Sequence, residues 1–198
     1  HSLSKVLKDD EVSVRFLAAR ALGTFPEAAT ALGHALKTDP HLPIRRAAID
    51  SLLKINSPEA ITHLLEVLET DPDAEMRSWI VYEMTVISNA VWGPSREIIL
   101  SSLSRITLND KDIKIRSAAI GYLNEARFIP VLRTILDSDS ESEVRRRAVD
   151  TLHSITFSRA HEAIGLLERA AALDPDSKVR ELASSYLARV PPALVQHL

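Results

Sequence analysis

The chain has 198 residues, an apolar fraction of 45% and a formal net charge of -3. That composition can bury a core and excludes an intrinsically disordered chain, while the small charge gives no overall attraction to nucleic acid or anionic lipid. The absence of cysteine excludes disulfides and cysteine-based metal sites, and no run of about 20 apolar residues is present to span a membrane.

In chain order, the sequence predicts short helices joined by turns, with no sustained β alternation. Residues 2–8 look like the second half of a helix pair, and Phe25-Pro26-Glu27-Ala28 opens another helix that ends near Lys37. Ser57-Pro58 supplies a cap and a first-turn proline for a helix that runs to Glu69.

A second set of helices is expected to alternate with the first. Pro43 suits a first turn, and three aspartates stand where they can cap helix starts: Asp73, Asp112 and Asp176. Residues 89–94 form an insertion in which Trp92 either packs over the core edge or anchors a protruding recognition loop. About thirteen helices are expected in all, and residues 191–195 resemble the start of a further first helix.

At six places along the chain, an aspartate is followed six residues later by an arginine. Each arginine follows an apolar residue, and further apolar residues stand three and seven positions after it. The arginines are 30, 32, 39, 29 and 35 residues apart, a spacing typical of repeat arrays. The pairs are Asp9/Arg15, Asp39/Arg45, Asp71/Arg77, Asp110/Arg116, Asp139/Arg145 and Asp174/Arg180. The pattern predicts an all-α, right-handed solenoid of about six antiparallel helix pairs.

We expect residues 1–198 to form one continuous solenoid domain. Repeat arrays need polar caps at their ends for solubility, and neither end of this sequence has one. The sequence therefore predicts a piece of a longer array, or an array whose ends are covered by partners.

The pattern Asp-x5-Arg-x2-Ala-x3-Leu resembles HEAT repeats, and is closest to the short regular repeats of the phycobilisome-lyase-like HEAT group. Residues 39–48 and 174–180 carry the resemblance best, while the third repeat departs most, with Met76, Ile80 and the large Trp79. The resemblance covers nearly the whole chain. It implies an armadillo-like solenoid whose second helices line a concave surface.

The twelve paired residues are assigned to the scaffold and are called the Asp–Arg ladder below. A row of arginines could instead bind phosphates, but each arginine recurs with its own aspartate, and a guanidinium fork suits bidentate carboxylate pairing. The resemblance implies that such residues connect adjacent turns of the solenoid.

The sequence predicts no catalytic constellation, metal site or cofactor. His34, His63 and His161 stand at different positions relative to the repeats, so they should not converge on a metal ion. His161-Glu162 is similar to the His-Glu pairs of HEAT-type deoxyhypusine hydroxylases, which need several such pairs. The basic cluster at residues 145–147 is flanked by acidic residues, which argues against nucleic-acid binding.

The predicted binding surface consists of the residues one and five positions after the ladder arginines, because these do not repeat and point away from the core stripe. They are Phe16, Arg20, Arg46, Asp50, Tyr82, Arg146 and Asp150. Aromatic and arginine side chains are common interface anchors. The alternative is an ordinary mixed solvated face.

The leading functional interpretation is a non-enzymatic scaffold that binds another protein or a peptide. The alternative is an accessory or lyase-like protein that handles a bilin or another prosthetic group on a client protein, and it depends on the resemblance alone. The sequence leaves the partner, the pathway and the compartment open.

Overall fold

The computed structural model describes residues 3–88, 94–156 and 160–191, and the regular secondary structure within these ranges is all helical. These ranges contain twelve α-helices and three 3₁₀-helices. Residues 1–102 and 103–198 form two compact units, here called unit 1 and unit 2. The boundary between the two units falls inside α7.

Unit 1 begins with α1 (Leu3–Val6), α2 (Val12–Ala21), η1 (Leu22–Thr24), η2 (Pro26–Ala28) and α3 (Ala29–Thr38). It continues with α4 (Leu42–Ile55), α5 (Pro58–Thr70), α6 (Ala74–Ser88) and the first part of α7 (Pro94–Asn109). Unit 2 contains α8 (Ile113–Ile120), η3 (Ala126–Phe128), α9 (Ile129–Ser138), α10 (Ser142–Ile155), α11 (Ala160–Leu173) and α12 (Ser177–Leu187).

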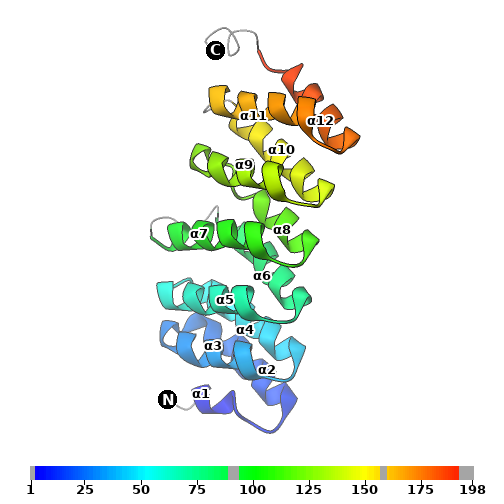
Figure 1. The fold of residues 1–198 in the computed structure, drawn as a ribbon. Helices are drawn as coiled ribbons and strands as arrows, with labels where there is room; N and C mark the ends of the chain where they lie inside the picture. The colour runs from blue at the N-terminus through cyan, green and yellow to red at the C-terminus, as the bar shows by residue number, and fades with distance from the viewer. Residues whose placement is uncertain (1–2, 89–93, 157–159, 192–198) are drawn as a thin grey trace. The chain divides into compact units, whose positions relative to one another are not determined.

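Helices pack in two rows within each unit (Figure 1). In unit 1 the first helices α3 and α5 pack together, and the second helices α2, α4 and α6 form the other row. In unit 2 the first helices α9 and α11 are adjacent, and α8, α10 and α12 are the second helices. The predicted arrangement of paired helices is therefore confirmed, while the handedness of the complete superhelix stays a prediction.

Four helix starts, those of α5, α6, α8 and α12, follow from the predicted capping residues. Ser57 accepts the N–H of Ala60 at 3.2 Å, and Asp112 and Asp176 cap α8 and α12. The prediction at Phe25-Pro26 is wrong in one respect: the chain first makes a 3₁₀ turn, and the α-helix begins only at Ala29. The sequence predicts about thirteen helices, and the described ranges contain twelve α-helices. Of the further helix expected to start over residues 191–195, only Pro191 is described.

The predicted apolar stripe is the core of each unit. Ile44, Ala48 and Leu52 have no exposed surface in unit 1, and the equivalent residues of α10 are equally buried. Ile55, in the last turn of α4, is only partly buried. The third repeat buries Met76 and Ile80 completely despite its unusual side chains, so its stripe has the same role as the others.

Two sequence features lie apart from this packing. The predicted recognition loop around Trp92 falls outside the described residues. Among the helices that are described, none combines the length and the apolar character that a membrane crossing requires.

Candidate functional site: the face of the second helices

The Asp–Arg ladder connects consecutive repeats within each unit. In unit 2, Arg145 donates from Nε and a terminal nitrogen to both carboxylate oxygens of Asp174, each at 2.9 Å. Arg116 makes the same fork with Asp139, at 2.9 and 3.0 Å. In unit 1, Arg15 pairs with Asp39, and Arg45 forms an ion pair with Asp71.

The structure corrects the predicted pairing between the arginines and the aspartates of the ladder. The arginine's side-chain fork reaches the aspartate of the following repeat and not the aspartate six residues before it. The preceding aspartate contributes its backbone carbonyl, which accepts a hydrogen bond of 2.8 Å from the other terminal nitrogen of the arginine. This bond is present for Arg15, Arg77, Arg116 and Arg145. Arg180 uses the carbonyls of Asp174 and Pro175 in the same way. One guanidinium thus fixes its own interhelical turn and the next repeat together.

The side chain of each ladder aspartate also stabilises the interhelical turn in which the aspartate lies. In all six repeats, a carboxylate oxygen accepts the N–H of the residue two positions later at 2.8–2.9 Å. This Asx-type bond competes with helix continuation and therefore separates the two helices of a pair. The sequence identified the aspartate through its spacing, and the structure shows that it serves the turn and the ladder at once.

The ladder is electrostatically favourable at neutral pH. Burial is the largest influence on Asp39 and raises its pKa, but the hydrogen bonds from Arg15 and from the His41 N–H lower it more. A carboxylate whose folded pKa is depressed stabilises the fold above its unfolded pKa, and this stability is lost as pH falls through the folded pKa. The hydrogen bonds that Arg145 donates to Asp174 in turn raise the pKa of Arg145.

A fixed register relates neighbouring second helices on their exposed face. Counting from the ladder arginine, residues +1 and +5 of one helix meet residues +2 and +6 of the next. Arg46 (+1) lies 4.9 Å from the ring of Trp79 (+2), and Asp150 (+5) accepts the hydroxyl of Tyr186 (+6) at 2.6 Å. Gly121 (+5) lies beside the Arg147 guanidinium (+2), which a β-carbon at Gly121 would meet at 2.7 Å.

The predicted residues of unit 1 lie along this face. Arg20 is positioned over the Phe16 ring, 5.8 Å from its centroid. Arg46 is held by Trp79 and by an ion pair with Glu75. Asp50 is at the surface of α4, and Tyr82, on α6, is 63% exposed. Together with Trp79 and Glu83, the five predicted residues form what we call the unit 1 face.

In unit 2, the two predicted residues, Arg146 and Asp150, are both bound to other side chains of the same unit. Arg146 forms an ion pair with Glu143 at 3.1 Å. The ring of Tyr186, whose hydroxyl binds Asp150, stacks on His153 with a centroid distance of 4.0 Å. A groove of about 390 Å³ between α8 and α10 contains both predicted residues, with Lys114, Ser117, Glu143 and Arg147 among its other lining residues.

Sequence reasoning missed the residues at +2 and +6. They are Trp79, Glu83, Arg147 and Tyr186. In the sequence, Trp79 stands out only by its size, and the structure shows its indole Nε1 buried without an acceptor among the described residues. A usable signal was present: +2 and +6 are four residues apart, so they share a helix face just as +1 and +5 do.

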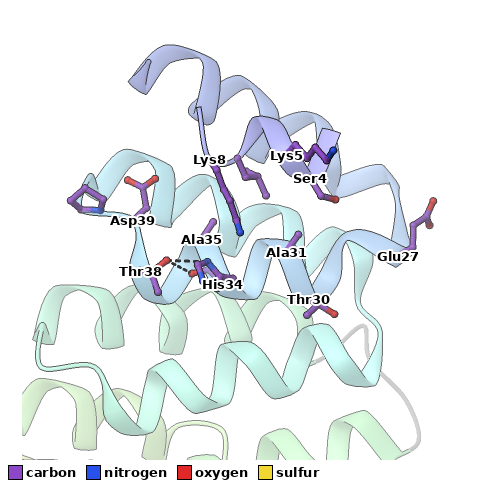
Figure 2. A pocket seen from close by; sticks show the side chains of 12 residues that line it. Ser4, Lys5, Lys8, Glu27, Thr30, Ala31, His34, Ala35, Thr38 and Asp39 are labelled. Carbon is purple, nitrogen blue, oxygen red and sulfur yellow. Dashed lines mark hydrogen bonds between the residues drawn. The ribbon is translucent and has the colours of Figure 1, made fainter. Parts of the chain in front are cut away.

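A further hollow lies elsewhere, between α1 and α3 of unit 1 (Figure 2). Its volume is about 690 Å³, and its lining includes Leu7, Ala31, His34 and Thr38, with Thr38 Oγ1 donating to the His34 carbonyl at 2.9 Å. It adjoins a four-residue helix, whereas the other first helices have ten to sixteen residues. The hollow therefore belongs to the row of first helices and not to the second-helix face.

No group of three or more potential metal ligands is present among the residues that the structure describes. His34 and His63 are both in unit 1, on α3 and α5. His34 interacts with Thr38, and His63 lies beside Glu66. Neither belongs to a metal cluster.

The fold and the ladder define the class as an all-helical repeat solenoid of antiparallel helix pairs. The sequence matches the profile of HEAT repeats over residues 2–85 and 100–188. The chain belongs to the HEAT-repeat family, and the resemblance drawn from the sequence is confirmed. No curated protein matches the chain in sequence.

Solved structures of similar fold share few identical residues with the chain. A designed armadillo repeat protein in complex with the peptide (KR)4 is 17% identical, with 94% of this chain and 97% of that chain covered and a TM-score of 0.53. The YibA protein of E. coli is 19% identical, with 95% and 67% covered and a TM-score of 0.52. The complex of CpcE and CpcF of phycocyanin lyase from Nostoc sp. PCC7120 is 20% identical, with 93% of each chain covered and a TM-score of 0.38. The first two structures show a shared fold and nothing more. The TM-score of the third is too low to show even that.

Proposed function

We propose that this protein is a non-enzymatic scaffold that binds a partner protein or peptide through the face of its second helices. HEAT repeats commonly mediate protein binding, and a designed armadillo protein of similar fold was solved with a bound peptide. The core and the ladder repeat along the chain, whereas the exposed face differs from repeat to repeat. Such a division supports a constant frame that carries a specific surface.

The exposure of the Tyr82 side chain is the main observation in support of this proposal. Its side chain is 63% exposed on the unit 1 face, although tyrosine is large and mainly apolar. An aromatic ring with a polar tip provides much contact area at a low entropic cost, which suits an interface anchor. Charged and aromatic neighbours surround the same face, so the patch offers both apolar contact and charge recognition.

The partner can be sought by pull-down with the chain, followed by mass spectrometry and an absorbance scan. A colourless stable complex with a protein or peptide supports the scaffold. A bound chromophore with visible absorbance would instead favour the handling of a bilin or another prosthetic group, and would contradict the proposal.

We expect Tyr82→Ala to weaken binding of that partner by about thirtyfold, because truncating an interface anchor costs about 2 kcal/mol or more. Calorimetric titration measures the affinity. Folding should change by no more than about 0.5 kcal/mol, since the side chain is exposed. Phe25→Ala is the matched control, because Phe25 is a partly exposed aromatic of unit 1 that precedes η2 and is not on a second helix. Equal affinities for the parent and both variants would remove Tyr82 from the site.

A further inference from the structure

The groove on the second-helix face of unit 2 has one side of small residues and one side of charged residues. It lies between α8 and α10 and has a volume of about 390 Å³. From α8 it is lined by Lys114, Ser117 and Ala118, which are three or four positions apart and therefore share one face of the helix. The side chains that line it from α10 are all charged: Glu143, Arg146, Arg147 and Asp150. Because serine and alanine are small, the α8 side leaves room for a side chain of a partner.

The two acids of this groove are already bound within unit 2, whereas two of its cations are not. Glu143 forms an ion pair with Arg146 at 3.1 Å, and Asp150 accepts a tyrosine hydroxyl of α12 at 2.6 Å. Lys114 and Arg147 are exposed, and the side chain of neither forms an ion pair or a hydrogen bond within the described residues. The groove therefore contains two positive charges that no carboxylate in the described part of the chain binds.

Gly121 determines where the guanidinium of Arg147 lies. The backbone at Gly121 has φ -58° and ψ -17°, an ordinary right-handed conformation that does not require glycine. A β-carbon there would instead stand 2.7 Å from a terminal nitrogen of Arg147. In the other repeats the same +5 position has a side chain: Arg20, Asp50, Tyr82, Asp150 and Ser185. The glycine thus gives the guanidinium a place at the C-terminal end of α8, where the helix dipole favours a cation without supplying a carboxylate.

An exposed apolar side chain lies in the same groove. Ile113, the first residue of α8, is 39% exposed and lines the groove beside Lys114. A peptide can place an apolar side chain next to a carboxylate and so contact both. A nucleic acid would instead bring a row of phosphates, which the carboxylates of Glu143 and Asp150 would repel. The chemistry of the groove therefore favours an acidic peptide segment.

We infer that the groove between α8 and α10 binds an aspartate or glutamate side chain of a partner peptide, with the carboxylate between Lys114 and Arg147 and a neighbouring apolar side chain against Ile113. An ionised carboxylate accepts hydrogen bonds through both oxygens, so an ammonium and a guanidinium can bind it together. The hydroxyl of Ser117, which has no partner within the ranges that the structure describes, is a third donor. The inference rests on the proposed scaffold function and adds the chemical class of the partner.

NMR titration of the isotope-labelled full chain measures the affinity and the place of binding together. The probe is a peptide with the motif Glu-Leu-Glu between glycine-serine flanks, and matched peptides carry glutamine or lysine in place of glutamate. The glutamate peptide should bind most tightly of the three. It should shift the amide signals of Ser117 and Gly121 more than those of unit 1.

Arg147→Gln and Lys114→Gln should each weaken binding of the glutamate peptide roughly tenfold, the effect expected for losing one hydrogen bond to a charged group. Arg133→Gln is the matched control, because Arg133 is an exposed arginine of unit 2 on the first helix α9. It removes the same charge away from the groove and should change the affinity less than about twofold.

Gly121→Ala separates the position of the guanidinium from its charge. The new β-carbon should displace the end of the Arg147 side chain and weaken peptide binding, although every charge is retained. The melting temperature should stay equal or rise, since alanine suits a right-handed backbone position better than glycine does. Unchanged affinity in this variant would show that the observed place of the guanidinium does not matter for binding.

Equal loss of binding in Arg133→Gln would reduce the effect to general attraction. Binding of the glutamine or lysine peptide as tight as that of the glutamate peptide, or tighter binding of a single-stranded oligonucleotide, would assign another kind of ligand; each of these results overturns the inference. If the partner recovered by pull-down needs Tyr82 but is indifferent to Lys114 and Arg147, the scaffold function stands and the selectivity for an acidic segment fails. Recovery of a chromophore in place of a protein or peptide would contradict the scaffold function itself.

Discussion

Arg145→Ala should lower the free energy of unfolding by about 3–5 kcal/mol, the range for removing one member of a buried ion pair. The side chains of Arg145 and Asp174 are only 5% and 2% exposed. The substitution leaves the Asp174 carboxylate buried without its two guanidinium hydrogen bonds, and it also frees the Asp139 carbonyl. Urea unfolding at neutral pH, followed by circular dichroism, measures the loss.

Arg180→Ala is the matched control for this prediction. Arg180 occupies the same position in the last described repeat and donates to backbone carbonyls, but it makes no carboxylate fork within the described residues. Its truncation should therefore cost clearly less than that of Arg145. A similar loss for the two variants would mean that the backbone bonds, and not the inter-repeat carboxylate, account for the stabilisation.

Leu152→Ala and Leu52→Ala should each destabilise the protein by about 2–5 kcal/mol, because truncating a buried leucine loses apolar burial and leaves a cavity. Both side chains are completely buried at the +7 position of a second helix, one in each unit. Denaturant midpoints with unchanged slopes would report the loss as a change in stability. Leu173→Ala provides the comparison, since Leu173 is 72% exposed on α11, and it should stay within about 0.5 kcal/mol of the parent. Midpoints for the two core variants equal to the parent would refute the assigned core.

The sequence predicted the parts of the fold that depend on local periodicity. The stripe containing Leu52 or Leu152 follows from 3.6 residues per turn, and the starts at Ser57, Asp112 and Asp176 follow from local capping chemistry. The ladder was found by its spacing but assigned to the wrong carboxylate, because the forks join residues 23–29 positions apart in the next repeat. The periodicity of a single helix cannot predict a contact with a residue in the next repeat.

Only part of the candidate face was predicted, because the rest of it also depends on contacts between repeats. The +1 and +5 residues stand out on a single helix, but Trp79, Glu83 and Tyr186 become part of the face only through the offset between adjacent helices. That offset results from the packing of the buried rows and the ladder. The contact between Gly121 and Arg147 could be recognised only once this register was known. Whether the two units present one continuous surface stays a prediction.

Site-specific photocrosslinking tests most directly the claim that the second helices carry the binding surface. The photoreactive residue p-benzoylphenylalanine would replace Tyr82 on α6 in one variant and the exposed Thr62 on the first helix α5 in another, and each variant would be irradiated with the partner recovered by pull-down. The scaffold account predicts a covalent adduct from position 82 and little or none from position 62. An adduct formed mainly from position 62, or equally from both, would contradict it.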